Sequence, residues 1–394
     1  MLIGLEILRD SPQLAKSWGR CGLMMNQASV TRDFSPSWQV LQSVLGDRLI
    51  ALFGPQHGLV STVQDNMIES GHSRHGPSGL PVYSLYSETR EPSAAMLANL
   101  DTMIIDIQIV GCRVYTFKYT IAAILRAAKK HGKKVVVLDR PNPLGGSLIE
   151  GRTLSMDVTS FVGEFPIPMR HGLTPGECAG YFNREIGAPL EVVLLKNWVP
   201  DIQWSGLSRH WVLTSPNLPT IDSVYVYPGM VAFEGTNVSE GRGTGLPFQF
   251  IGAPFVDAEK FAAGIRAQGA FDQAVYLRPT QFQPTSQKWA GQVCNGVQLH
   301  VLDHRRVNSY ALALAMLHTL ATDYPRDFQW REPGYEYDFK NAPIDLIIGQ
   351  SHSGKAIADH SLSVTGPLAH FGVSDFLRDS EAAILYPRQR ALNT

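Results

Sequence analysis

The feature that most limits how this chain can fold is a set of four short, almost wholly apolar runs. Helical patterns separate these runs. In chain order the runs are CGLMMNQA (21–28), LIALF (49–53), TMIIDIQ (102–108) and KVVVL (134–138). Between them, residues 37–45 and 116–131 carry apolar side chains at helical spacing. Runs this short and apolar are typical of parallel strands that helices cover on both faces. The alternation therefore predicts a doubly wound, parallel α/β sheet.

The amino-acid composition and the pattern of predicted elements change after about residue 222. Pro, Gly, Thr and Asn cluster at 215–220 and 227–245. Further on, the sequence predicts helices at 257–268 and 309–323 and strands around 274–277 and 297–302. A chain of 394 residues is also too long for one ordinary core. We expect a Rossmann-like α/β domain at residues 1–222 and a smaller α/β (α+β) domain at 223–394 that closes a cleft.

The charge pattern narrows the choice of partner. The formal net charge is -1 and no long run of like charges occurs. Nucleic acids and anionic membrane surfaces both require a concentrated basic patch, so neither is expected as a partner. No run of about 18 apolar residues predicts a membrane span. No signal peptide is visible after Met1, which predicts a cytoplasmic protein, although an exported chain whose leader has been removed would read the same way.

Cofactor and metal motifs are incomplete. Neither GxGxxG nor a full phosphate-binding loop occurs, and the nearest string, GQSHSGKA, ends in Ala356 where a hydroxyl is required. No HxH or HExxH string occurs, and the four cysteines lie far apart, so we expect buried free thiols. The sequence predicts no cofactor and no metal.

Polar residues gather where the four runs end. They include Asn26 after the first run, Gln56 and His57 after the second, Tyr115 after the third, and Arg140 and Asn142 after the fourth. In an open parallel sheet, ligands bind at the carboxyl ends of the strands. We therefore expect these turns to share one site.

Several strings together resemble a known family. FGPQHG, IIDIQIVGCRVYTF, VVVLDRPNPLGG, FPIPMRHGLTPGE, SPNLPT and YPGMVAFEGTNVSEGRGTGLPF follow one another along nearly the whole chain. In this order they resemble the exo-β-N-acetylmuramidases of the NamZ type, a family long catalogued as a domain of unknown function. The resemblance implies a Rossmann-like domain, a smaller domain and a site between them. It also implies a glycosidase that removes N-acetylmuramic acid from non-reducing ends of peptidoglycan fragments, in cell-wall turnover or recycling.

Two positions depart from the family pattern. The family usually has the string FGPEHG, whose glutamate is the suspected catalytic group, and this chain has Gln56 in place of that glutamate. The family also usually has the string DIQDVG, and this chain has Ile109 in place of its second aspartate. A glutamine cannot exchange a proton as a general acid or base near neutral pH. Either another carboxylate has taken over this role, or the activity differs, or the protein binds a sugar or muropeptide without cleaving it.

The candidate catalytic residues are Gln56, Glu69, which we expect in the same loop, and Glu240, in a glycine-rich loop. Arg140, Arg170 and Arg242 suit the lactyl carboxylate of N-acetylmuramic acid, because a guanidinium binds a carboxylate in a bidentate manner. Each arginine could instead form an ion pair within the protein. The candidate substrate-binding residues are Asn26, His57, Asp106, Tyr115, Arg140, Asn142, His171, Glu234, Asn237 and Arg242.

Overall fold

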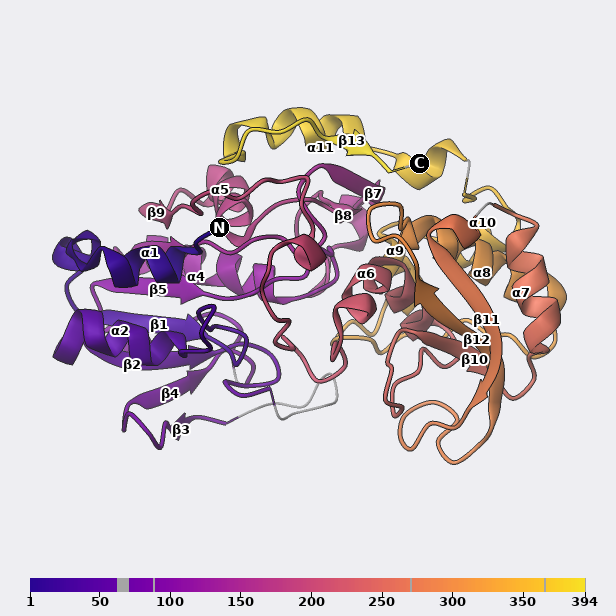
Figure 1. The fold of residues 1–394 in the computed structure, drawn as a ribbon, viewed down its shortest axis with the longest axis horizontal. Helices are drawn as coiled ribbons and strands as arrows, with labels where there is room; N and C mark the ends of the chain where they lie inside the picture. The colour runs from indigo at the N-terminus through magenta and orange to yellow at the C-terminus, as the bar shows by residue number, and fades with distance from the viewer. Residues whose placement is uncertain (62–70, 88, 270, 365, 394) are drawn as a thin grey trace.

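The computed structural model describes residues 1–61, 71–87, 89–269, 271–364 and 366–393. Its largest sheet has seven strands in the order β3-β4-β2-β1-β5-β6-β9 (Figure 1). Neighbouring strands are parallel except for β3, which runs antiparallel to β4. The strands are β1 (Cys21–Met25), β2 (Leu49–Gly54), β3 (Ser73–Arg74), β4 (Pro81–Ser84), β5 (Thr102–Asp106), β6 (Lys134–Leu138) and β9 (Leu190–Val193).

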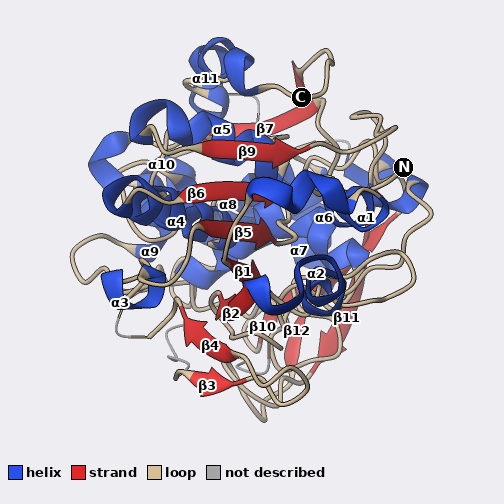
Figure 2. Ribbon diagram, turned by 90° about the vertical axis from the view of Figure 1, so that its left-hand side faces the viewer, coloured by secondary structure: helices blue, strands red, loops and turns tan. Residues whose placement is uncertain are grey.

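Helices cover both faces of this sheet. Successive side chains of a strand point to opposite faces, so Leu23 and Ile104 pack in one hydrophobic cluster while Met24 and Ile105 pack in another. The predicted doubly wound α/β layer is confirmed, and Figure 2 shows its strands stacked from β9 to β3. The covering helices are α1 (Gly4–Asp10) and α2 (Ser37–Leu45) on the first face, and α4 (Phe117–His131) and α5 (Pro175–Ile186) on the second.

The central strand β1 is the point where the strand order reverses. From β1 the chain passes to β2 and β4 on one side of it, and then to β5, β6 and β9 on the other side. In doubly wound sheets the crevice at such a reversal, beyond the carboxyl ends of the strands, is the usual place for a ligand. The polar turns that follow β1, β2, β5 and β6 all emerge at this edge.

A second, antiparallel sheet lies at the opposite end of the molecule (Figure 1). It has the order β10-β12-β11 and packs against the helix predicted at 257–268, and the helix predicted at 309–323 packs in turn against that helix. The proposed domain boundary after residue 222 falls in the first turn of α6, and it stays a prediction. The elements of this part are α6 (Ile221–Met230), β10 (Phe250–Ala253), α7 (Ala258–Arg266), β11 (Val275–Phe282), β12 (Cys294–Val301) and α8 (Ser309–Asp323).

The C-terminal segment returns from the second sheet to the first. The guanidinium of Arg388 pairs with the buried carboxylate of Glu177 on α5 at 2.6 and 2.7 Å. Strand β13 adds in parallel to β7 and completes a three-stranded sheet in the order β13-β7-β8. The remaining elements are α3 (Ala94–Leu97), β7 (Leu148–Thr153), β8 (Pro168–Arg170), α9 (Pro343–Ile348), α10 (Ser353–Ala358), α11 (Val373–Asp379) and β13 (Ala391–Leu392).

The cysteines are buried and free, as the sequence predicts. Within the part of the chain that the structure describes, no helix has the length and apolar character that a membrane span requires. Over the same residues, no group of three or more His, Cys, Asp or Glu side chains could hold a metal ion.

Candidate functional site

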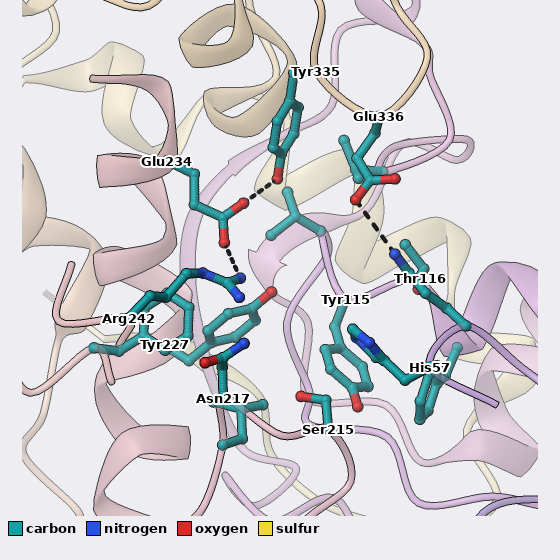
Figure 3. Close-up of a pocket in the computed structure, with 16 residues that line it drawn as sticks. His57, Tyr115, Thr116, Ser215, Asn217, Tyr227, Glu234, Arg242, Tyr335 and Glu336 are labelled. Atoms are coloured by element: carbon teal, nitrogen blue, oxygen red, sulfur yellow. Dashed lines mark hydrogen bonds and ion pairs between the residues drawn. The ribbon is translucent and has the colours of Figure 1, made fainter. Parts of the chain in front are cut away.

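A pocket lies between the carboxyl edge of the large sheet and loops from the second half of the chain (Figure 3). Its lining mixes aromatic rings with acids, amides, hydroxyls and one guanidinium, a mixture that suits a sugar. It is lined by Gln56, His57, Val114, Tyr115, Thr116, Phe117, Val162, Ser215, Asn217, Leu218, Tyr227, Glu234, Arg242, Phe248, Tyr335 and Glu336.

The turn after β2 brings Gln56 into this pocket. The hydroxyl of Thr116 donates to Gln56 Oε1 at 2.6 Å. The Nε2 atom of Gln56 donates to Glu336 Oε1 at 3.4 Å. In this orientation the amide oxygen faces the threonine, and the amide nitrogen, which can only donate, faces the glutamate. Gln56 is therefore held as a hydrogen-bond donor to Glu336.

Glu336 is a buried acid that the sequence did not single out. It is 4% exposed, and its Oε2 atom accepts a hydrogen bond from the hydroxyl of Tyr86 at 3.1 Å. Burial, reinforced by the negative charge of Glu234, raises the pKa of Glu336 to about 7. A carboxyl group with this pKa can hold and release a proton near neutral pH, which is the property that a glutamine lacks.

The backbone at Glu336 is strained. Its φ of 47° and the φ of 68° at Tyr337 are both in the left-handed region. Two consecutive residues other than glycine rarely adopt this conformation, and each costs about 1–3 kcal/mol. Such strain persists where the surrounding structure holds a residue in position, and here the strained residue is the one whose carboxyl group contacts Gln56.

Glu234 supplies a second carboxylate on the other side of the pocket. It lies on a 3-10 turn, Val231–Gly235, and pairs through Oε1 with Arg242 Nη2 at 2.5 Å. Its Oε2 atom accepts a hydrogen bond from the hydroxyl of Tyr335 at 2.6 Å, and Figure 3 shows Glu234 between these two partners. Both oxygens of Glu234 are thus occupied by fixed donors.

Glu240 lies behind Arg242 rather than among the lining residues. Its carboxylate pairs with Arg242 Nε at 3.2 Å and with Lys288 Nζ at 2.8 Å. Burial raises the pKa of Glu240, but these two cations outweigh it and lower the pKa below its ordinary value. Burial lowers the pKa of Arg242, and the carboxylates of Glu234 and Glu240 outweigh that effect and raise it. Glu240 is therefore an ionised partner of Arg242 and is not suited to donate a proton.

Among the other predicted site residues, His57 and Tyr115 line the pocket together with Gln56, Glu234 and Arg242. Glu69, the alternative carboxylate, lies outside the residues that the structure describes.

Three predicted asparagines have their side chains bonded to the backbone. In each, the amide nitrogen donates to a carbonyl and the amide oxygen accepts from a backbone N–H. The partners are Thr214 and Ala28 for Asn26, Leu173 and Leu144 for Asn142, and Asp327 and Gln329 for Asn237. These side chains fix the turns that carry the pocket, and they do not line it.

One of the two predicted histidines and two of the predicted arginines also lie outside the pocket. His171 is fully buried, and burial holds its pKa well below its ordinary value. Arg170 pairs with Glu150, and Arg140 pairs with Asp106 through two contacts of 2.5 and 2.8 Å. Each of Arg140, Arg170 and Arg242 therefore forms an ion pair within the protein, which is the alternative that the sequence left open.

Glu336 and Tyr335 were missed because no local motif marks them. They lie in the string PGYEYDF, where the only signal is an acid between two tyrosines after a Pro-Gly turn. The contact between Glu336 and Gln56 joins residues 280 positions apart in the chain. Only the packing of the second half of the chain against the first brings the two together.

Comparison with known proteins gives a consistent result. The family model described as "Exo-beta-N-acetylmuramidase NamZ, N-terminal" matches residues 21–222, and the model for the C-terminal part of the same family matches residues 225–386. The peptidoglycan beta-N-acetylmuramidase NamZ of Bacillus subtilis (strain 168) is 42% identical over 333 residues, which are 84% of this chain and 80% of that protein.

Two solved structures share the fold over the full length. Both are described as DUF1343 family proteins from Bacteroides fragilis NCTC 9343. One superposes with a TM-score of 0.86 at 29% identity, covering 98% of this chain and 99% of that one. The other superposes with a TM-score of 0.73 at 26% identity, covering 99% of each chain.

Proposed function

Because this chain belongs to the NamZ family of exo-β-N-acetylmuramidases, we propose that it releases N-acetylmuramic acid from the non-reducing ends of peptidoglycan fragments. The observation that carries the proposal is the contact between Gln56 and Glu336. The family usually has a glutamate where this chain has Gln56, and here a carboxyl group from another part of the chain lies beside the glutamine. The carboxyl chemistry is therefore kept in the same pocket, on a different residue.

In the proposed reaction Glu336 is the general acid. Its pKa of about 7 keeps a proton available at neutral pH. As the bond between the anomeric carbon and the glycosidic oxygen breaks, that oxygen takes the proton from Glu336. A water molecule supplies the hydroxyl group that ends on the anomeric carbon, and the remaining proton of that water restores the carboxyl group of Glu336. Gln56 acts as a positioning residue, because its amide nitrogen hydrogen-bonds the same carboxyl group.

The charges around the pocket are compatible with an anionic sugar. The carboxylates of Glu234 and Glu240 are offset by the cations of Arg242 and Lys288. With Glu336 protonated, this set carries no net charge, so the lactyl carboxylate of N-acetylmuramic acid meets no excess of negative charge. The aromatic rings of the lining, such as Tyr115 and Tyr227, give the sugar ring apolar surface to pack on.

The direct test uses the purified protein and two chromogenic substrates, the β-glycosides of N-acetylmuramic acid and of N-acetylglucosamine. We expect release of the chromophore from the first and little from the second, which lacks the lactyl group. A disaccharide of N-acetylmuramic acid and N-acetylglucosamine should yield free N-acetylmuramic acid by chromatography. No turnover of any of them between pH 5 and 9 would contradict the proposed activity.

A second candidate function, favoured by Gln56 itself, is a protein that binds a sugar or muropeptide without cleaving it. Ligand-observed NMR with the same disaccharide separates the two. Saturation transfer to an intact disaccharide over hours supports the binding protein, whereas the appearance of free sugar signals supports the hydrolase.

A further inference from the structure

A second pocket lies at the reversal point of the large sheet. It lies beyond the carboxyl ends of β1, β5 and β6. We call it the switch-point pocket; it is lined by Ala28, Val30, Thr31, Arg32, Phe34, Gln108, Arg140, Trp204, Arg209, His210 and Val212. It shares no lining residue with the candidate sugar pocket, although the loop of residues 204–218 contributes to both.

Three guanidinium groups line the switch-point pocket, and two carboxylates pair with them. Arg140 pairs with Asp106, and Arg209 pairs with the buried Glu6. Arg32 is exposed, and its side chain donates only to the carbonyl of Ser208 among the contacts of the described residues. The three arginines and two acids leave an excess of one positive charge, before any contribution from His210.

The cations in this pocket are close enough to affect one another. Burial lowers the pKa of Arg209, and the charges of Arg140 and Arg32 lower it further, against the opposing effect of Glu6. Mutual repulsion of this kind is relieved when an anion binds between the cations, since each cation then gains a charge-assisted hydrogen bond.

Three residues that line the switch-point pocket each carry a buried polar atom without a partner in the part of the chain that the structure describes. Within the described residues, the buried Nε of Arg209 and Nε1 of Trp204 have no acceptor. The buried Oε1 of Gln108 likewise has no donor there. Unpaired buried groups are rare in folded proteins, so each calls for an explanation. Two donors and one acceptor match a ligand that carries both an anionic group and a hydroxyl group.

We propose that the switch-point pocket binds a small hydroxylated anion whose phosphate or carboxylate group lies between Arg32 and Arg209. The stacked rings of Phe34 and His210, with centroids 5.7 Å apart, form an apolar wall for the carbon skeleton. Arg140 positions the pocket, because its guanidinium is occupied by Asp106 and by the carbonyl of Val30. This site is independent of the proposed hydrolysis.

Isothermal titration calorimetry at constant ionic strength tests the proposal with three probes that share one skeleton: glycerol 3-phosphate, D-glycerate and glycerol. We expect saturable binding of the phosphate, the carboxylate or both, and none of glycerol. The stronger of the two anions identifies the anionic group. Arg32→Gln and Arg209→Gln should each weaken binding at least tenfold, and Arg326→Gln, at an exposed arginine remote from this loop in the sequence, should leave it unchanged.

Circular dichroism shows which variants fold. If loss of the pairing with Glu6 unfolds Arg209→Gln, the exposed Arg32→Gln still decides the question. Absence of binding by either anion up to about 10 mM overturns the proposal, as does binding that Arg32→Gln does not weaken.

Discussion

Glu336→Gln is expected to lower kcat/KM for a chromogenic N-acetylmuramic acid glycoside by about 100- to 10,000-fold, the usual contribution of a general acid. The substitution keeps the size of the side chain and removes the exchangeable proton, and it replaces one of the two acceptor oxygens by an amide nitrogen, which only donates. The matched control is Glu332→Gln, an exposed acid four positions earlier, which should change kcat/KM less than twofold.

The pH profile separates a chemical role from a structural one. Glu336 acts in its protonated form, and its pKa is raised to about 7. The wild-type kcat/KM should therefore fall as the pH rises through about 7, and this limb should be missing from the residual activity of Glu336→Gln. A variant that folds normally and keeps more than a third of the wild-type activity would exclude Glu336 as the acid.

Arg242→Met is expected to lower the free energy of unfolding by about 3–5 kcal/mol, because it leaves the buried Glu234 and Glu240 without their shared cation. The pairs that it breaks measure 2.5 and 3.2 Å, and the side chain of Arg242 is only 12% exposed. Activity should be lost as well, since Glu234 lines the pocket. The deficit should shrink at acid pH, where protonation neutralises Glu234, which has lost its cation, and Glu240, which keeps only Lys288.

Urea unfolding followed by tryptophan fluorescence measures this effect. The control is Arg278→Met on β11, since that arginine is exposed and contacts only Gln298 and His300 through side-chain hydrogen bonds in the described structure. We expect the free energy of unfolding of this control to fall by less than about 1 kcal/mol. Equal losses in the two variants would show that the cluster around Arg242 contributes no more than a surface contact.

The large sheet could be predicted because the sequence signals that determine it lie within its own strands and the adjoining helices. Strands buried on both faces must be apolar throughout, and every residue of β5 is indeed buried. The helix predicted at 116–131 occurs at Phe117–His131 and ends at Gly132 with φ 63°, a conformation that favours glycine. These signals lie within a few residues of the structure that they determine.

The site could be predicted only in part because it depends on packing between distant segments. The turns after β2 and β5 do reach one pocket, as the apolar runs before Gln56 and Tyr115 indicate. The loop of residues 204–218 divides the carboxyl edge of the sheet into two pockets, so Arg140 lies in a different pocket from Gln56. No spacing in the sequence reveals this division. Nor does any spacing reveal that Glu336, from the other half of the chain, lies in the same pocket as Gln56.

The central claim is that Glu336 supplies the acid in place of a glutamate at position 56. The most direct test measures kcat/KM of the variant Gln56→Glu from pH 5 to 9. The new carboxylate would replace the amide that donates to Glu336 at 3.4 Å. Since two adjacent acids raise each other's pKa, we expect the basic limb to move to higher pH, with less than a threefold gain at pH 7. A gain of a hundredfold or more that survives when Glu336→Gln is added would contradict the claim, because position 56 would then hold the missing acid.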